Sequence, residues 1–513
     1  MASIVRSIGI LGLDGYVIDV EVSVYNGLAM TTIVGLGDAA VKEARDRIET
    51  CFFQMDLIYP MKKIVINLSP SDVKKSGTHF DLAMMVGIML ESDQIKPYDF
   101  AIDEYIFLGE ISLTGELKSF QGVLPMIIAA KNRGYKKVII PTLCFKEATL
   151  VEGMQIYPFD HIKKVKLFIE TKMERKPAEA KKEDHLPEQF HVDFADVSGH
   201  HDVMEYVIAA AAGNHNLLLI GAPGCGKSMI AKRMPTILPD MIMEEVLEVT
   251  SIYSICGLLK EHQLIKTRPF RSPHYNASSN ALIGGGINAM PGEISLAHNG
   301  ILFLDELPEF SRSTLESLRQ PLEDRIVTIS RVKQTNVFPA NFQLVAAMNP
   351  CPCGNHGSSL CLCTAHDIKR YTQRISGPIL DRIDIQKYLG KVNPLVTNTQ
   401  KTNKCSKEIK ERVQHVRKIQ WTRFLNVPGI NSNAQMEVAH IKEFCSLTVE
   451  SLDLLQKSYE KFQFSARTYN KIIKIARTFA DMDFSKDIQK KHIISGLMSR
   501  DLDKDKKTMV VNE

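Results

Sequence analysis

The chain has 513 residues, which at roughly 150 residues per domain predicts about three domains. A composition of 44% hydrophobic and 24% charged residues is globular and excludes disordered and fibrous classes. Lys and Arg number 63 against 59 Asp and Glu, so the net charge of +4 excludes a wholesale polycation but not a local basic surface.

The longest apolar run, residues 82–90, is far shorter than the roughly 18 residues of a membrane span. The first 15 residues lack the basic and then apolar pattern of a secretory signal. We therefore expect a cytoplasmic protein with no membrane partner.

Residues 1–167 alternate between strand-like and helix-like patterns. Turn signals such as Gly35-Leu36-Gly37-Asp38 separate them, which indicates an α+β or α/β domain. The expected strands are 16–24, 63–68 and 137–141, and the expected helices are 39–55, 80–90 and 123–132.

The composition changes over residues 163–182, where eight Lys or Arg accompany three Glu and Pro177, with little apolar periodicity. This pattern favours a solvated linker, which we place at residues 168–191. A basic arm that binds nucleic acid is the alternative.

Residues 192–392 have the strand, loop and helix pattern of a nucleotide-binding domain. The apolar run 217–220 leads into Gly221-Ala222-Pro223-Gly224-Cys225-Gly226-Lys227-Ser228. This stretch matches the P-loop, whose backbone N–H groups surround phosphates at the start of a helix. We expect these eight residues to bind ATP, with Lys227 on the β- and γ-phosphates and Ser228 on Mg²⁺.

Two further apolar strands end in polar side chains. Residues 300–304 precede Asp305, which suits Mg²⁺ binding, and Glu306, which suits the activation of water. Residues 344–348 precede Asn349, which could hold the attacking water.

The remaining segment, 393–513, is expected to form a helical domain. Its predicted helices are 407–425, 439–444, 449–462, 466–482 and 486–498.

The order of these motifs resembles that of AAA+ ATPases: Asp305-Glu306 as Walker B, Asn349 as sensor 1, 380–382 as the arginine finger and 465–467 as sensor 2. Residues 268–274 and 291–298 resemble the magnesium-chelatase-like branch. Within that branch the chain resembles the YifB/ComM-type proteins of bacteria, which are linked to DNA uptake and recombination.

The resemblance implies a hexameric ring with an AAA+ core and a C-terminal helical lid. Arg382 would enter a neighbour's nucleotide site, with Arg374 as the rival for this role. Arg467 would contact the γ-phosphate within its own subunit.

A cysteine cluster follows Asn349, with two C-x-C pairs formed by Cys351, Cys353, Cys361 and Cys363. Four thiolates on a turn-rich loop suit a structural tetrahedral Zn²⁺. The one-residue gap is shorter than the usual zinc spacing, and His356 or His366 could replace one ligand. Reduced loop cysteines without a metal are the alternative.

The N-terminal segment resembles the proteolytic domain of Lon, of the ribosomal-S5 type, through residues 109–116, 129–130 and 137–141. That domain uses a Ser nucleophile and a Lys base, whose positions here hold His79 and Leu124. We expect a Lon-like α+β fold without peptidase activity. Ser76 with Lys74 or Lys75 is the one improvised dyad.

Three segments could contact DNA. In residues 325–337 a predicted hairpin carries Arg331 and Lys333, and a hairpin at this position enters the ring pore in related AAA+ helicases. Residues 401–423 hold eight Lys or Arg against two Glu, near Trp421, although this stretch taken alone favours a solvated helix face. Residues 284–288 form a glycine-rich loop that suits a pore loop or a hinge.

The leading hypothesis is a hexameric AAA+ ATPase that uses ATP and Mg²⁺ to translocate on single-stranded or branched DNA, as a helicase or in branch migration. A chelatase-like motor that remodels a protein partner is the main alternative. An ATP-dependent peptidase is a weaker one, because both dyad positions are substituted.

Overall fold

The computed structural model describes residues 2–171, 177–178, 190–259, 263–286, 289–331, 334–390 and 404–502. Most of the predicted linker, Lys333 and residues 401–403 lie outside this part. The chain forms two compact units, the first comprising Met1–His185, Val246–Ile265 and Thr328–Phe338. The second comprises Leu186–Glu245, Lys266–Val327 and Pro339–Glu513.

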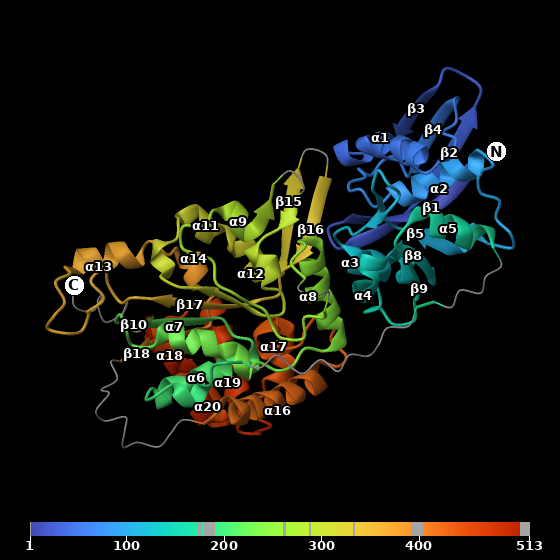
Figure 1. Cartoon of the computed structure of the whole chain (residues 1–513). Coiled ribbons are helices and arrows are strands. Elements are labelled where there is room, and N and C mark those ends of the chain that lie inside the picture. The colour runs from blue at the N-terminus through green and yellow to red at the C-terminus, as the bar shows by residue number, and fades with distance from the viewer. Residues whose placement is uncertain are drawn as a thin grey trace. The chain divides into compact units, whose positions relative to one another are not determined.

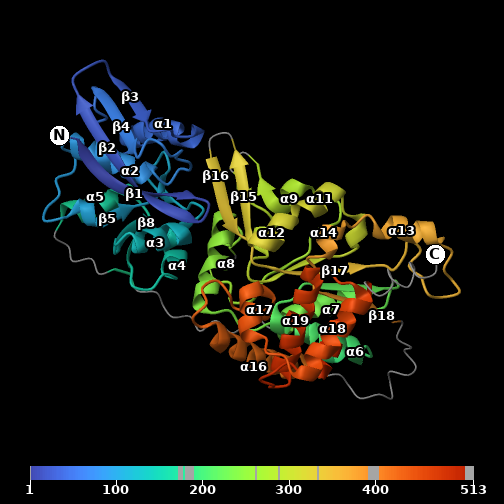
Figure 2. The same cartoon turned by 180° about the vertical axis from the view of Figure 1, so that it is seen from behind.

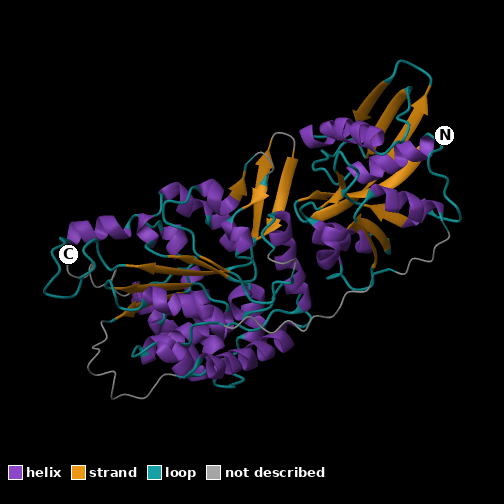
Figure 3. Ribbon diagram, viewed as in Figure 1, coloured by secondary structure: helices purple, strands orange, loops and turns teal. Residues whose placement is uncertain are grey.

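The first unit contains a seven-stranded mixed sheet in the order β3-β4-β2-β1-β5-β8-β9. Its strands are β1 (Ser3–Leu11), β2 (Asp14–Tyr25), β3 (Met30–Val34), β4 (Lys63–Ser69), β5 (Tyr105–Phe107), β8 (Lys137–Pro141) and β9 (Gln155–Phe159), with a small separate pair β6 (Glu110–Ile111) and β7 (Leu117–Lys118). Its helices are α1 (Ala39–Gln54), α2 (Asp81–Glu91), α3 (Val123–Asn132), α4 (Phe145–Ala148) and α5 (Ile162–Glu170). Figure 3 shows these strands in orange with helices beside them.

Residue periodicity explains the centre of this unit. Ile18, Val20 and Val22 of β2 alternate with less buried neighbours, as expected for a strand with one face on a core. Helix α2 is apolar on all sides and is buried against this sheet. The three strands and three helices predicted here are present with shifts of at most a few residues.

The predicted linker needs one correction, because α5 occupies residues that we expected to be irregular. Ile162, Val165, Phe168 and Ile169 of this helix are buried. Their three- and four-residue spacing is that of a helix face, and the lysines between them point away from it. The basic residues of 163–170 therefore belong to an amphipathic helix and not to an irregular linker.

The second unit contains a five-stranded parallel sheet in the order β11-β14-β17-β10-β18. The strands are β10 (Leu217–Gly221), β11 (Phe270–Arg271), β14 (Ile301–Leu304), β17 (Gln343–Met348) and β18 (Ile385–Leu389). All residues of β10, β14 and β17 are buried, because helices cover both faces of a parallel sheet. Figure 1 shows β10, β17 and β18 together, with α6, α16 and α19 beside them.

The helices of the second unit surround this sheet. They are α6 (His201–Gly213), α7 (Lys227–Arg233), α9 (Ser279–Ile283), α10 (Glu293–Leu296), α11 (Arg312–Ser317), α12 (Arg319–Asp324), α13 (Ala365–Thr372), α14 (Gly377–Leu380), α16 (Ser406–Phe424), α17 (Val438–Phe444), α18 (Val449–Phe462), α19 (Ala466–Met482) and α20 (Lys490–Met498). Helix α8 (Met243–Ile255) begins in the second unit and continues in the first.

Two short hairpins complete the fold. Strands β15 (Ile326–Arg331) and β16 (Gln334–Pro339) form the hairpin predicted before sensor 1, visible in Figure 2. Strands β12 (Gly284–Gly285) and β13 (Met290–Pro291) pair around the glycine-rich loop, of which residues 287–288 lie outside the description.

The predicted helical lid shares a core with the nucleotide-binding sheet. Val413 of α16 and Ile475 of α19 pack in one cluster with Leu219 and Phe303. A second cluster lies within the lid and includes Ile472 of α19. This shared core explains why the lid helices and the nucleotide-binding sheet lie in one compact unit, and the boundaries between domains stay predictions.

Among the described residues, no helix combines the length and apolar character needed to cross a membrane.

Candidate active site

The P-loop connects β10 to α7, as its strand, loop and helix context predicts. Gly224 and Gly226 have φ angles of +76° and +95°, a region that favours glycine, and their conformation carries the loop around the start of α7. Lys227 Nζ donates to the carbonyl of Gly221 at 2.6 Å and to Asn349 Oδ1 at 3.1 Å. The fold thus brings the side chains of Lys227 and Asn349, which are 122 residues apart in the sequence, into contact.

Ser228 and Asp305 also meet, because the Ser228 hydroxyl donates to Asp305 Oδ2 at 2.7 Å. A hydroxyl and a carboxylate are oxygen ligands of the kind that Mg²⁺ uses beside nucleotide phosphates. The next residue, Glu306, is exposed and has a φ angle of +51°, and its backbone N–H donates to Asp305 Oδ1 at 2.9 Å. This turn places two carboxylates with different contacts at the end of one strand.

Strand register places these motifs at one edge of the sheet. The P-loop follows β10, Asp305 follows β14 and Asn349 follows β17, and the three strands are parallel neighbours. All three motifs therefore lie at the carboxyl ends of their strands, where parallel α/β sheets bind ligands.

Arg382 lies at the other end of the strands, at their amino ends, here called the amino edge of the sheet. It precedes β18, whose first residue, Ile385, pairs with Leu217, the first residue of β10. The carbonyl of Arg382 accepts a hydrogen bond from Asn216 Nδ2 at 2.9 Å, just before β10. Strand β10 has five residues, and at about 3.3 Å per residue its two ends are roughly 16 Å apart. Arg382 lies at the amino end and the P-loop at the carboxyl end, so Arg382 lies away from the P-loop of its own chain.

Arg467 lies beside Arg382. Both arginines form ion pairs with Glu323 of α12, and the Arg467 pair measures 3.7 Å. The three residues line a cavity of about 850 Å³ that contains no P-loop residue. This placement corrects the expected contact of Arg467 with the nucleotide of its own subunit, because sequence motifs carry no information about which sheet edge a lid helix reaches.

Arg374, the rival finger, has a different partner. It forms an ion pair with Glu309 at 2.8 Å, three residues after Glu306, and its side chain is half exposed. The two candidate fingers therefore occupy separate surfaces.

Lys471 of helix α19 contacts the loop of residues 381–384 before β18, which contains Arg382 and is called the finger loop. This side chain donates to the carbonyl of Asp381 and lies 3.1 Å from Asp384 Oδ1. Burial raises the pKa of Asp384, but the charge of Lys471 and the His215 ring, whose Nδ1 lies 3.8 Å from Oδ2, outweigh it and hold that pKa well below its usual range. The ionised carboxylate thus connects the finger loop to the lid.

The four sulfur atoms of the cysteine cluster all lie within 4.8 Å of one another. Neither His356 nor His366 belongs to the group. The structure therefore supports the four-thiolate set as the candidate metal site.

The positions expected to lack a peptidase dyad are both buried. His79 Nε2 lies 3.0 Å from the carbonyl of Ile8, and Leu124 is in the core. Lys75 is buried, and its Nζ has no hydrogen-bond partner in the described part of the chain, whereas Ser76 is exposed. Ser76 thus has no contact with Lys75 that would activate it.

The candidate DNA segments differ in what the structure shows. The hairpin is present, but Lys333 and the side chain of Arg331 lie outside the described residues. On α16, Lys410, Arg412 and Arg423 form ion pairs with Asp240, Glu205 and Asp481. These internal pairs favour a structural role for the basic stretch.

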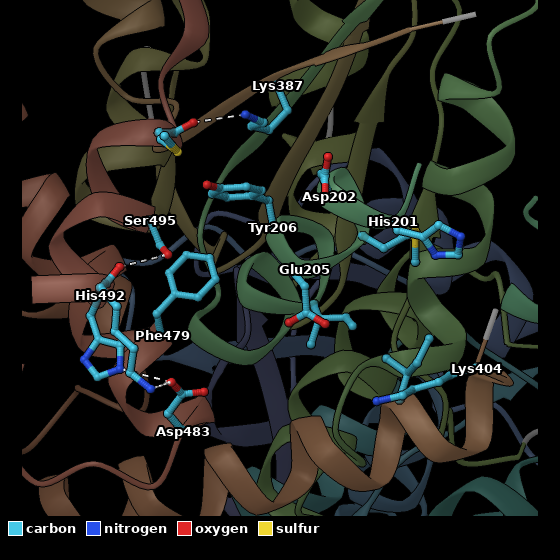
Figure 4. A pocket seen from close by; sticks show the side chains of 15 residues that line it. His201, Asp202, Glu205, Tyr206, Lys387, Lys404, Phe479, Asp483, His492 and Ser495 are labelled. Atoms are coloured by element: carbon cyan, nitrogen blue, oxygen red, sulfur yellow. Dashed lines mark hydrogen bonds and ion pairs between the residues drawn. The ribbon is translucent and has the colours of Figure 1, made fainter. Parts of the chain in front are cut away.

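A second cavity of about 850 Å³ lies among α6, β18, α16, α19 and α20 (Figure 4). Tyr206 and Lys387 line it, with Lys387 Nζ 4.5 Å from the Tyr206 ring centroid. Asp483 and His492 form another pair in its wall at 3.2 Å. None of its lining residues belongs to the predicted nucleotide site.

Sequence reasoning missed two side chains that contact predicted site residues. Glu323 contacts both Arg382 and Arg467, and His200 Nε2 donates to the carbonyl of Cys225 in the P-loop at 3.0 Å. No local pattern identifies either, because each contact joins residues distant in the sequence.

Comparison with known families covers most of the chain. The model for magnesium chelatase, subunit ChlI, matches residues 193–396. The models for subunit ChlI of Mg-chelatase and for the ChlI C-terminal region match residues 20–143 and 403–500.

Individual relatives match over nearly their whole length. The protein YifB of Escherichia coli is 38% identical over 98% of this chain and 97% of its own. The competence protein ComM of Haemophilus influenzae is 37% identical over 96% of both chains, and YifB of Salmonella typhimurium is 36% identical over 98% of this chain and 97% of its own. The resemblance inferred from the motifs is confirmed: the chain belongs to the YifB/ComM family of magnesium-chelatase-like AAA+ ATPases.

Proposed function

We propose that this chain hydrolyses ATP in a hexameric ring, at sites completed by neighbouring subunits, and that the ring translocates on DNA. The observation that carries the proposal is the separation of two sets of residues on one sheet. Lys227, Ser228 and Asp305 lie at the carboxyl edge, and Arg382 and Arg467 lie at the amino edge.

In this proposal the P-loop binds ATP, and Ser228 with Asp305 holds Mg²⁺ beside the phosphates. Glu306 accepts a proton from the attacking water, and Asn349 positions that water. In the structure, Asn349 accepts a hydrogen bond from Lys227. Arg382 and Arg467 of the next subunit would stabilise charge on the γ-phosphate, so hydrolysis would require assembly.

The DNA-directed part rests on two points. The relative from Haemophilus influenzae is named a competence protein, which supports a role in DNA uptake or recombination. The hairpin β15–β16 occupies the position proposed for DNA contact through Arg331 and Lys333. Helicase or branch-migration activity is the specific form we propose.

The domain assignment belongs to the same proposal: a Lon-like N-terminal domain at 1–167, a linker at 168–191, an AAA+ core at 192–392 and a lid at 393–513. The N-terminal domain would serve as a ring scaffold or a DNA-binding platform without peptidase activity. A casein cleavage assay with and without ATP tests that absence. ATP-stimulated cleavage that Ser76→Ala abolishes would contradict it.

The decisive experiment measures ATP hydrolysis with and without single-stranded or forked DNA at low salt. We expect DNA to stimulate hydrolysis in the wild type and not in the Arg331→Ala/Lys333→Ala variant. Lys457→Ala/Lys461→Ala, which removes two lysines of lid helix α18, is the matched control and should respond like the wild type. If DNA neither binds nor stimulates hydrolysis, the DNA-motor proposal fails.

A chelatase-like motor that remodels a protein partner is the second candidate, favoured by the match to magnesium chelatase subunit models. ATP hydrolysis that depends on assembly but not on DNA would favour it.

A further inference from the structure

The loop of residues 349–364 connects β17 to α13 and gathers four thiols in a turn-rich segment. The Sγ atoms of Cys351 and Cys353 are 3.4 Å apart, those of Cys351 and Cys361 are 3.9 Å apart, and those of Cys353 and Cys361 are 3.7 Å apart. Cys363 completes the group, and all four cysteines are free.

These separations match the edges of a thiolate tetrahedron around a metal. With Zn–S bonds of about 2.3 Å, tetrahedral geometry places the sulfur atoms about 3.8 Å apart. A disulfide would require about 2.05 Å between two of them. The spacing therefore fits one shared Zn²⁺ better than two oxidised pairs, despite the short C-x-C gaps.

The cluster adjoins the P-loop. Cys351 lies two residues after Asn349, which accepts a hydrogen bond from Lys227. Gly354 has a φ angle of +77°, and a Cβ atom added to it would lie 2.5 Å from Cδ of Pro223, within the P-loop. The backbone at Gly354, in the turn that follows Cys353 (the cysteine turn), therefore packs directly against the Pro223 ring.

We propose that Cys351, Cys353, Cys361 and Cys363 bind one Zn²⁺, and that this metal holds Gly354 against Pro223 and so sets the affinity of the P-loop for nucleotide. The hydrogen bonds described within the cysteine segment are short turn bonds such as Gly354 N to Cys351 O, and the metal would fix the segment beyond them. The coupling to nucleotide rests on the proposed ATP site, and the metal site itself does not.

The metal site is tested on the purified full chain by elemental analysis and by Co²⁺ substitution. We expect about one zinc per chain and, after exchange, the visible absorption of a tetrahedral Co²⁺–thiolate site. Cys353→Ser should lose both signals. Cys405→Ser, which changes a cysteine at the N-cap of α16 outside the cluster, is the control and should keep them. Absence of metal and of the thiolate bands in the wild type would overturn the site.

The coupling is tested by titrating ATP with fluorescence detection. Cys353→Ser should weaken ATP binding by about 10- to 100-fold, because small displacements of a binding loop have effects of that size. Gly354→Ala keeps all four thiols and should retain zinc and the Co²⁺ spectrum, yet it should weaken ATP binding through contact of its Cβ with Pro223.

The outcomes separate the proposals. If Cys353→Ser loses zinc, stays folded by circular dichroism and binds ATP like the wild type, the coupling is overturned. If Gly354→Ala binds ATP normally, the contact with Pro223 does not transmit the effect, which also overturns the coupling. If the wild type holds zinc but binds no ATP, the proposed ATPase function fails while the metal site stands.

Discussion

Glu306 and Asp305 are adjacent carboxylates with different environments, and this difference is consistent with the separate roles proposed for them. Asp305 accepts the hydroxyl of Ser228, whereas Glu306 is exposed beyond the strand. We expect Glu306→Gln to bind ATP normally and to hydrolyse it about 10² to 10⁴-fold more slowly, because the amide cannot accept the proton of water. Glu460→Gln, at an exposed position on α18, should hydrolyse at the wild-type rate in the same phosphate-release assay. Equal loss of binding and hydrolysis in Glu306→Gln would contradict the assignment.

His79 should make folding sensitive to acid. It packs against the rings of Phe80 and Phe120, with centroids at 4.0 and 5.5 Å, and burial lowers its pKa from 6.5 to about 4. The folded state therefore binds this proton less readily than the unfolded state. Its stabilising contribution is complete above pH 6.5 and is lost, by roughly 3 kcal/mol, as the pH falls to about 4.

Thermal unfolding of the full chain at pH 7 and pH 4.5 tests this. We expect His79→Gln, which keeps a donor for the carbonyl of Ile8, to show a smaller drop in Tm between the two pH values than the wild type. His415→Gln, at an exposed position on α16, should keep the wild-type drop. Identical drops in all three proteins would show that His79 does not control the transition.

At the scale of elements, the contact of α19 with the finger loop depends on one mostly buried ion pair. Asp384 and Lys471 lie 3.1 Å apart with side chains about one seventh exposed. Removal of one partner leaves the other charge buried and unpaired. We expect Asp384→Asn to lower the free energy of unfolding by about 3 kcal/mol, measured by urea denaturation.

An exposed ion pair provides the comparison. Asp453 and Lys457 on α18 are 2.7 Å apart and largely exposed, so Asp453→Asn should change the free energy of unfolding by less than about 0.5 kcal/mol. If the two variants are equally stable, the pair at Asp384 does not connect the lid to the finger loop.

At the scale of the whole molecule, a shared site predicts complementation between inactive subunits. Lys227→Ala and Arg382→Ala should each lose about 10³-fold of the hydrolysis rate. In randomly mixed closed rings, about a quarter of the interfaces would join an intact P-loop to an intact finger, so activity should return. If mixing restores nothing, Arg382 does not act between subunits.

The same mixing experiment distinguishes the two candidate fingers. Arg374 is paired with Glu309 on another surface, so a mixture of Arg374→Ala and Lys227→Ala should gain no activity beyond that of Arg374→Ala alone. If ATP hydrolysis recovers in the mixture with Arg374→Ala and not in the mixture with Arg382→Ala, Arg374 is the finger.

Local chemistry in the sequence predicted the P-loop, the carboxylates that end β14, and part of the helices and strands, but not others such as β1 and α6. These features depend on neighbouring residues: glycines where φ is positive, apolar side chains at a strand or helix period, and a helix that begins at Lys227. The same reasoning missed α5, because lysines between Ile162, Val165 and Phe168 masked its apolar face.

Only the tertiary structure decided which distant residues meet. Parallel pairing of β18 with β10 places Arg382 at the amino ends of the strands, opposite the P-loop, and Arg467 of α19 pairs with the same Glu323. It also placed the cysteine turn on Pro223. Such contacts join residues far apart in the chain, so their chemistry leaves no periodic or short-range pattern. The sequence alone therefore predicted a nucleotide site, and the fold placed two of the predicted arginines at the opposite ends of the strands.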